Sequence, residues 1–278
     1  MSRPRPDERL ALAWARLSAG LTLAAVAVLA GFLLLHGLPV LGRALFFGAT
    51  PPLDALLGRQ PVWDGIWPAC AGTLSLVLLA AGMAVPAGVA CGIHLAVFAR
   101  GRWRDLLRLG VDLLAGVPSI VYGLLGLGIF VAYLGLGFSL ISAGLTLSIM
   151  TLPLMISSAR EAIAAVPGTV REASYALGAT KWQTIWHHVL PYALPGIFTG
   201  IILSVSRAAG ETAPLMLTGV AMSLQRLPDS FFDSFMALPY HVFYMATQSS
   251  DLLATRPIQY ATALVLLLGI FPNPLIDI

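Results

Sequence analysis

The chain has 278 residues, of which 58% are hydrophobic and only 10% carry a charged side chain. Ordinary soluble domains contain about 25% charged residues, so the composition excludes that class and predicts an integral membrane protein. The net charge of +3 is small and gives no reason to expect nucleic acid as a partner. We expect an all-α integral membrane protein with about six transmembrane helices.

Six apolar stretches approach the ~20 residues that a helix needs to cross a bilayer. In chain order they are 17–35, 69–99, 109–136, 138–159, 192–222 and 258–276. We expect residues 1–16 to form a cytoplasmic N-terminus and residues 17–278 a transmembrane domain with its core at 69–222. The first span lacks a small-residue cleavage pattern, which favours an uncleaved anchor.

Basic residues are distributed unevenly between the two sides of the predicted membrane. If the N-terminus is cytoplasmic, eleven basic residues lie inside and four lie outside. The inside residues are Arg3, Arg5, Arg9, Arg16, Arg100, Arg102, Arg104, Arg108, Arg160, Arg171 and Lys181, and the outside residues are Arg43, Arg59, Arg226 and Arg256. Because cytoplasmic loops carry an excess of Lys and Arg, this asymmetry predicts a cytoplasmic N-terminus.

Small residues and prolines are concentrated in spans two to five, as is typical of transporter bundles. Gly88 and Gly92 form a GxxxG unit, which predicts close contact between helices. The third span contains Gly116-Val117-Pro118-Ser119, so we expect it to be bent or interrupted. Irregular backbone at membrane depth is tolerated where it is buried or lines a cavity, and this segment is therefore a candidate for lining a pathway.

A polar cytoplasmic loop is expected at residues 160–191, built as a helix, a bend and a second helix. Two capping boxes are predicted, Thr169 with Glu172 and Thr180 with Gln183. Gly178 lies between them and can take the left-handed conformation that ends a helix. The second short helix is expected to last until Pro191.

The fifth span contains one arginine and one glutamate, one helical turn apart. The face that carries them reads Gly200, Ser204, Arg207, Glu211, Pro214 and Thr218. A charged side chain near the bilayer centre is costly, so such residues usually face a bundle interior or a water-filled path. We predict Arg207, Glu211, Ser204 and Thr212 on a substrate pathway. The alternative is that Arg207 and Glu211 only satisfy each other and fix helix packing.

Motifs of common catalytic and metal sites are absent from the sequence. No GxxxxGK[ST] loop occurs, so this chain is not expected to hydrolyse nucleotide. The five histidines, His36, His94, His187, His188 and His241, are scattered. Cys70 and Cys91 fall too far apart on one predicted helix for a disulfide. We therefore predict no catalytic residue and no metal site.

The cytoplasmic loop carries a recognisable pattern. Glu172-Ala173-Ser174, then Gly178 after three residues and His188-Val189-Leu190-Pro191 after nine more, resembles the EAA loop of bacterial ABC importer permeases. Segments 114–121 (LAGVPSIV) and 206–214 (SRAAGETAP) make the chain similar to PstA-type permeases of phosphate-specific importers. The resemblance covers about 72–218 well and 236–268 more loosely. It implies a type I ABC importer permease fold in the bacterial inner membrane and phosphate as the cargo.

The resemblance also implies partners. These are a second permease of the PstC type, an ATPase dimer of the PstB type, a periplasmic phosphate-binding protein of the PstS type, and membrane lipid. ATP and Mg would be bound by the ATPase, so no cofactor and no enzymatic activity is expected in this chain. The residues implied in coupling to the ATPase are Glu172, Ala173, Gly178, Thr180, Leu190 and Pro191.

Several positions depart from the family pattern, and other functions stay open. Ser174 replaces the second alanine of the loop, His188 replaces an aliphatic residue, and Val97 stands where an acid is expected. The end at 272–278 lacks the usual basic residues. The alternatives are a permease for another oxyanion, such as sulfate or molybdate, an ATP-independent anion channel or carrier, and a membrane anchor or assembly factor.

Overall fold

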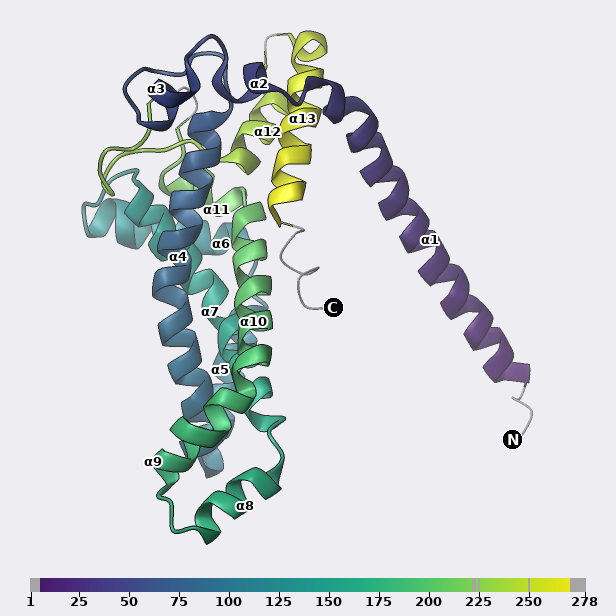
Figure 1. The fold of residues 1–278 in the computed structure, drawn as a ribbon, viewed down its shortest axis with the longest axis vertical. Helices are drawn as coiled ribbons and strands as arrows, with labels where there is room; N and C mark the ends of the chain where they lie inside the picture. The colour runs from purple at the N-terminus through teal and green to yellow at the C-terminus, as the bar shows by residue number, and fades with distance from the viewer. Residues whose placement is uncertain (1–5, 222–223, 225, 250, 271–278) are drawn as a thin grey trace.

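The computed structural model describes residues 6–221, 224, 226–249 and 251–270, which form helices joined by loops (Figure 1). The long helices are α1 (Pro6–Gly37), α4 (Trp67–Ile93), α5 (Gly101–Ala115), α7 (Leu140–Ala164), α10 (Leu190–Gly210) and α13 (Leu252–Ile270). The shorter ones are α2 (Arg43–Phe47), α3 (Pro52–Leu56), α6 (Ser119–Gly126), α8 (Gly168–Ala176), α9 (Lys181–Thr184), α11 (Ala213–Thr218) and α12 (Leu238–Thr247). A 3-10 turn, η1 (Leu38–Val40), and three π-helical turns, η2 (His94–Phe98), η3 (Leu127–Tyr133) and η4 (Ile185–Val189), complete the set. The all-α fold class is confirmed.

Four helical stretches within the described residues are long and apolar enough to cross a membrane, or five if the bent α5–α6 pair is one span. They are Leu12–Val40, Trp67–Phe98, Leu140–Ala164 and Lys181–Gly210, and the bent pair is Gly101–Ala115 with Ser119–Tyr133. The sixth expected span, 258–276, overlaps α13, which begins at Leu252. Its last residues, 271–276, lie outside the described residues.

The first helix, α1, leans away from the rest of the protein (Figure 1). None of its most apolar window is buried. Its C-terminal end meets α13, where the Phe32 ring lies 5.2 Å from the Tyr260 ring. A helix with an apolar, uncovered surface can be stable in lipid, because lipid tails are as apolar as leucine.

The centre of the bundle is α7, which packs between α4 and α10. Its apolar window is 61% buried, the largest share among the candidate spans of the described residues. A side chain at Gly92 of α4 would come within 2.6 Å of the Ala159 side chain on α7, so only glycine permits this approach. The predicted close contact at the GxxxG unit is confirmed, with α7 as the neighbour.

The third predicted span is sharply bent. Helices α5 and α6 make an angle of 96° across the Gly116–Pro118 connection. Pro118 has no N–H to continue the helical hydrogen bonds, and its ring disfavours helical geometry in the residue before it. The predicted interruption is therefore confirmed.

The fifth predicted span, 192–222, has the wrong bounds at both ends. The helical stretch begins at Lys181, because the π-helical turn η4 joins α9 to α10 without a break at Pro191. It ends at Gly210, four residues before Pro214. The ring of a proline clashes with the carbonyl four residues earlier, which explains why the helix stops there and α11 starts separately.

Candidate functional site

Arg207 and Glu211 form an ion pair across the end of a helix. The Nε atom of Arg207 lies 3.7 Å from Oε1 of Glu211, and their side chains are 51% and 18% exposed. Arg207 is in the last turn of α10, whereas Glu211 has an extended backbone with φ −75° and ψ 136°. The predicted pairing is present. The expectation that both residues share one face of a continuous helix is wrong, because Glu211 approaches from the connection to α11.

Arg207 also lines a cavity of about 120 Å³. The other lining residues come from the α5–α6 bend, α6 and α7, and they are Leu114, Ala115, Val117, Tyr122, Met150, Pro153, Leu154 and Ser157. Arg207 is the one charged residue among them. The volume is below the ~300 Å³ typical of pockets for drug-sized ligands. The cavity therefore combines a permanent positive charge with space for a small ion.

The bend between α5 and α6 forms one wall of this cavity. The hydroxyl of Tyr122 on α6 donates to the carbonyl oxygen of Leu114 on α5 at 2.8 Å, which connects the two sides of the bend. The backbone N–H of Val117 bonds to the same carbonyl at 3.1 Å. The Gly116–Ser119 segment, a candidate for lining a pathway, thus lies beside Arg207.

Ser157 was missed by the sequence analysis. It lines the Arg207 cavity from α7, and its hydroxyl forms no hydrogen bond with the residues that the structure describes. A serine inside a helix commonly bonds to the carbonyl of the preceding turn, as Thr151 does with Leu147 at 2.9 Å. The free hydroxyl can instead bind a ligand. The Ser157–Ser158 pair was visible in the sequence, but only the packing of α7 shows which serine faces the cavity.

Two other predicted pathway residues do not line the Arg207 cavity. Ser204 is 5% exposed and donates to the Gly200 carbonyl of its own helix at 2.8 Å. It lies at a narrow gap of about 10 Å³ shared with α4 and α7. Thr212 precedes α11, and its side chain does not cap that helix. Their place on a pathway stays a prediction.

The polar loop forms two short helices with a sharp bend, as expected. Gly178 has φ +80°, a left-handed conformation that side chains rarely adopt. The second capping box is confirmed, because the Thr180 side chain accepts from the Gln183 N–H and the Gln183 side chain accepts from the Thr180 N–H. The first is wrong. Helix α8 begins one residue before Thr169, with Pro167 at the N-cap and no side-chain cap.

Ser174 and Thr184 hold the two short helices together. Both residues are buried, and their hydroxyl oxygens lie 2.9 Å apart. Ser174, which departs from the family pattern, therefore has a hydrogen-bond partner in Thr184. An alanine at this position could not form this hydrogen bond. This contact joins α8 to the end of α9.

The surface of the loop is unusually apolar for a polar segment. Leu177 is 89% exposed, and the exposed rings of Trp182 and Trp186 stack with centroids 5.9 Å apart. Of the predicted coupling residues, Glu172, Ala173, Gly178, Thr180 and Pro191 are exposed and Leu190 is half-buried. Exposed apolar patches with a polar rim commonly mark protein interfaces.

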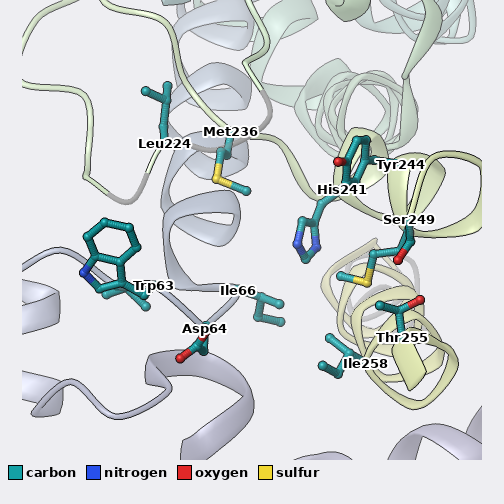
Figure 2. Close-up of a pocket in the computed structure, with 13 residues that line it drawn as sticks. Trp63, Asp64, Ile66, Leu224, Met236, His241, Tyr244, Ser249, Thr255 and Ile258 are labelled. Carbon is teal, nitrogen blue, oxygen red and sulfur yellow. The ribbon is translucent and has the colours of Figure 1, made fainter. Parts of the chain in front are cut away.

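A second cavity lies at the opposite end of the molecule from the loop. It measures about 280 Å³ and is lined by residues that include Trp63, Asp64, His241 and Tyr244 (Figure 2). His241 points into it, and its Nδ1 is buried without a hydrogen-bond partner in the described structure. Burial lowers the pKa of His241 to about 4. No local sequence pattern indicates this cavity, because its walls come from four separate segments.

The residues that the structure describes hold no candidate metal site. They contain no group of three or more His, Cys, Asp or Glu side chains that could hold a metal ion. The cavity of Arg207 has no carboxylate lining it. Its chemistry therefore suits an anion, which a guanidinium group binds through charge and hydrogen bonds.

Comparison with known proteins gives the family. Residues 84–272 match the binding-protein-dependent transport system inner membrane component. The chain belongs to this family. It is therefore a transport component of the inner membrane and a multi-pass permease. The family description is that of a transport component, in agreement with the expectation that this chain is not an enzyme.

Relatives of this permease include phosphate transport proteins. The chain is 40% identical over 180 residues to phosphate transport system permease protein PstA 1 of Mycobacterium tuberculosis, covering 64% of this chain and 58% of that protein. It is 32% identical over 243 residues to PstA of Xylella fastidiosa, covering 86% and 81%. The chain thus spans less than two thirds of the length of its mycobacterial relative.

Solved structures support the fold of this permease. A chain of the MetNI methionine ABC transporter in an inward-facing conformation matches with a TM-score of 0.59 at 16% identity, covering 76% of this chain and 94% of that one. An amino acid ABC transporter matches with a TM-score of 0.51 at 17% identity, covering 74% and 87%. The expected ABC importer permease fold is confirmed.

Proposed function

We propose that this permease carries inorganic phosphate into the cell as one membrane subunit of an ATP-driven importer. The single observation that carries the proposal is Arg207, which lines a small cavity against α7 and the α5–α6 bend. A guanidinium group is always charged and presents a planar fork of N–H donors that matches phosphate oxygens. Glu211, 3.7 Å away, balances the charge and favours release of the anion.

Phosphate is favoured over other oxyanions by the relatives. Three proteins that match this chain at 32–40% identity are named as phosphate permeases. The string 206–214 that contains Arg207 and Glu211 is also part of the resemblance to PstA-type permeases. Sulfate and molybdate are the competing substrates, since their tetrahedral oxyanions would fit the same guanidinium.

The partner of the cytoplasmic loop is a separate ATPase. Exposed Leu177 and the stacked Trp182 and Trp186 form an apolar surface that a motor subunit could cover. The capping box and the positive φ of Gly178 give this surface a fixed shape. In this arrangement the loop is cytoplasmic, and ATP and Mg are bound by the ATPase.

The other partners are a second permease and an external phosphate-binding protein. Helix α1 stands apart from the bundle and leaves room for a second membrane subunit beside it (Figure 1). The N-terminal end of α1 points to the same end of the molecule as α8 and α9, which supports a cytoplasmic N-terminus (Figure 1). The binding protein would dock at the opposite end.

Uptake by the assembled importer tests the proposal. The chain is produced with its partner subunits in cells that lack their own phosphate importers, and uptake of radioactive phosphate is measured. We expect uptake that arsenate inhibits and sulfate does not, because arsenate shares the geometry and protonation of phosphate. Sulfate or molybdate uptake without phosphate uptake would assign another oxyanion. Uptake that persists without the ATPase subunit would show a channel or carrier.

A further inference from the structure

Lys181 connects the cytoplasmic loop to the end of a helix that is distant in the sequence. Its Nζ donates to the carbonyl oxygen of Val97 at 2.8 Å, across 84 residues of chain. The same Nζ lies 4.5 Å from the centroid of the Phe98 ring. Lys181 is the only lysine in the sequence. The ammonium group of Lys181 therefore lies at the end of the helix that α4 and η2 form together.

The chemistry of a helix end explains this contact. Val97 is in the π-helical turn η2, and the backbone becomes extended at Ala99, with φ −67° and ψ 134°. The last carbonyl groups of a helix have no partner within it and carry the negative end of the helix dipole. An ammonium group satisfies such a carbonyl, and an aromatic face beside it adds a cation–π interaction. The resemblance suggested an acid at position 97, and here the backbone carbonyl takes the cation instead.

Arg171 forms the same kind of contact with a second helix. Its Nη2 donates to the Ile163 carbonyl at 2.7 Å, in the last turn of α7. The Ser174–Thr184 contact joins α8 to α9, so both cations belong to one connected unit. The loop is thus bound to the cytoplasmic ends of α4 and α7 by two hydrogen bonds. Lys181 donates one to the Val97 carbonyl, and Arg171 donates the other to the Ile163 carbonyl.

The backbone around Lys181 is also fixed. Lys181 is the first residue of α9, directly after Thr180, whose capping box orders this turn. From Lys181 the helical chain continues to Gly210 and carries Arg207 near its other end. A displacement of Lys181 therefore acts on α10 through the chain and on α4 through the Val97 contact.

We propose that Lys181 is a positioning residue that makes the end of α4 follow the loop when the ATPase moves it. This inference rests on the proposed function. Together with the contact of Arg171 in α8 to the Ile163 carbonyl of α7, the Lys181 contact makes α4, α7 and the base of α10 move together. Helix α5 has no buried residue. The α5–α6 bend is then the wall of the Arg207 cavity that changes position relative to the others.

The ratio of phosphate transported to ATP hydrolysed tests this role. The full importer is purified, reconstituted in vesicles with the external binding protein, and compared with a Lys181→Met variant, which keeps the apolar stem but lacks the ammonium group. We expect the ratio to fall by about tenfold, the change that follows from losing a hydrogen bond to a charged group. Lys181→Arg should restore most of it, because guanidinium can also donate to the carbonyl.

A matched control removes a positive charge from the same end of the protein. Arg102 is an exposed residue of α5, and Arg102→Met should leave the ratio unchanged. A Lys181→Met importer that assembles and keeps the wild-type ratio overturns the proposal. If that variant does not assemble, Phe98→Leu decides, since it weakens the contact and leaves the lysine in place. A lowered ratio then supports the proposal, and an unchanged ratio contradicts it.

The two proposals fail in distinguishable ways. A wild-type importer that hydrolyses ATP with the binding protein but carries no phosphate contradicts the proposed substrate. The Lys181 variants are then compared on the oxyanion that is carried. A wild-type importer that carries phosphate, together with an assembled Lys181→Met importer of equal ratio, contradicts only the positioning role.

Discussion

Arg207 is held by Glu211 across a helix end, with Nε and Oε1 3.7 Å apart, while its side chain stays 51% exposed. A purely structural buried pair would be shielded from solvent on both sides, because breaking such a pair is costly. Here the carboxylate is the more covered partner, with 18% exposure, and the guanidinium lines a cavity. The geometry therefore favours a role for Arg207 in binding over a role in packing alone.

Replacing Arg207 tests that role. We expect Arg207→Ala to lower phosphate uptake by about 10- to 100-fold, because a hydrogen bond to a charged group is worth roughly 1.5–3 kcal/mol. Arg207→Lys keeps the charge but loses the planar fork and should recover only part of the uptake. Uptake is measured with radioactive phosphate at matched amounts of assembled importer. Normal uptake by Arg207→Ala would show that the ion pair only stabilises packing.

Two serines distinguish which side of α10 faces the substrate. Ser157 lines the Arg207 cavity with a free hydroxyl, so Ser157→Ala should reduce uptake by about tenfold, the lower end of what the loss of one hydrogen bond to a charged group implies. The Ser204 hydroxyl already bonds to the Gly200 carbonyl, so Ser204→Ala should change uptake little. The apparent KM for phosphate is the most direct measurement. The reverse result would place the pathway between α10 and α4, on the side of Ser204, which the sequence analysis predicted to be a pathway residue.

The two predicted capping boxes give a test of the loop. Thr180 caps α9, so Thr180→Ala should destabilise the loop by roughly 1 kcal/mol, the usual effect of losing an N-cap. Thr169 lies inside α8 and makes no cap, so Thr169→Ala is the matched control. Hydrogen exchange of the amides at 181–184 should accelerate by about fivefold in the first variant, as that free energy implies. Equal exchange in both variants would contradict the assignment of the cap.

The lowered pKa of His241 predicts a pH dependence of stability. Burial holds its pKa at about 4, against an ordinary value of 6.5. Between these values the unfolded chain binds the proton more readily than the folded protein, so stability should fall as the pH is lowered from about 6.5 towards 4. The carboxylate of Asp64 and the hydroxyl of Tyr244 line the same cavity. Burial, and not either of these two groups, is the cause of the lowered pKa of His241.

Thermal unfolding in detergent measures this effect. The unfolding midpoint of wild type should drop more between pH 7.5 and pH 5 than that of His241→Gln, which has no titrating group at position 241. His36→Gln, at an exposed position near the end of α1, is the control and should behave as wild type. An equal drop for His241→Gln would mean that other groups account for the acid sensitivity.

Composition and local pattern were enough to predict the class of the protein and much of its loop. A charged share of 10% excludes a soluble domain, and Gly178 and Thr180 follow from backbone rules that act within a few residues. The interruption at Gly116–Pro118 follows from the same kind of rule, since proline removes a donor and clashes with the preceding turn. These features depend on the chemical nature of single residues and of their near neighbours in the chain. They can therefore be read from the sequence.

The tertiary structure decided which polar groups meet. The break before Pro214 separates Glu211 from α10, yet the chain returns it to Arg207, and the packing of α7 turns Ser157 towards the same cavity. The contact between Lys181 and Val97 joins residues 84 positions apart, and no local rule relates them. The sequence determined a membrane-spanning helical chain with a rigid loop, because burial of apolar surface and helix capping act locally. The cavity and the contacts between helix ends depend on how the helices pack against one another, and only the folded structure shows them.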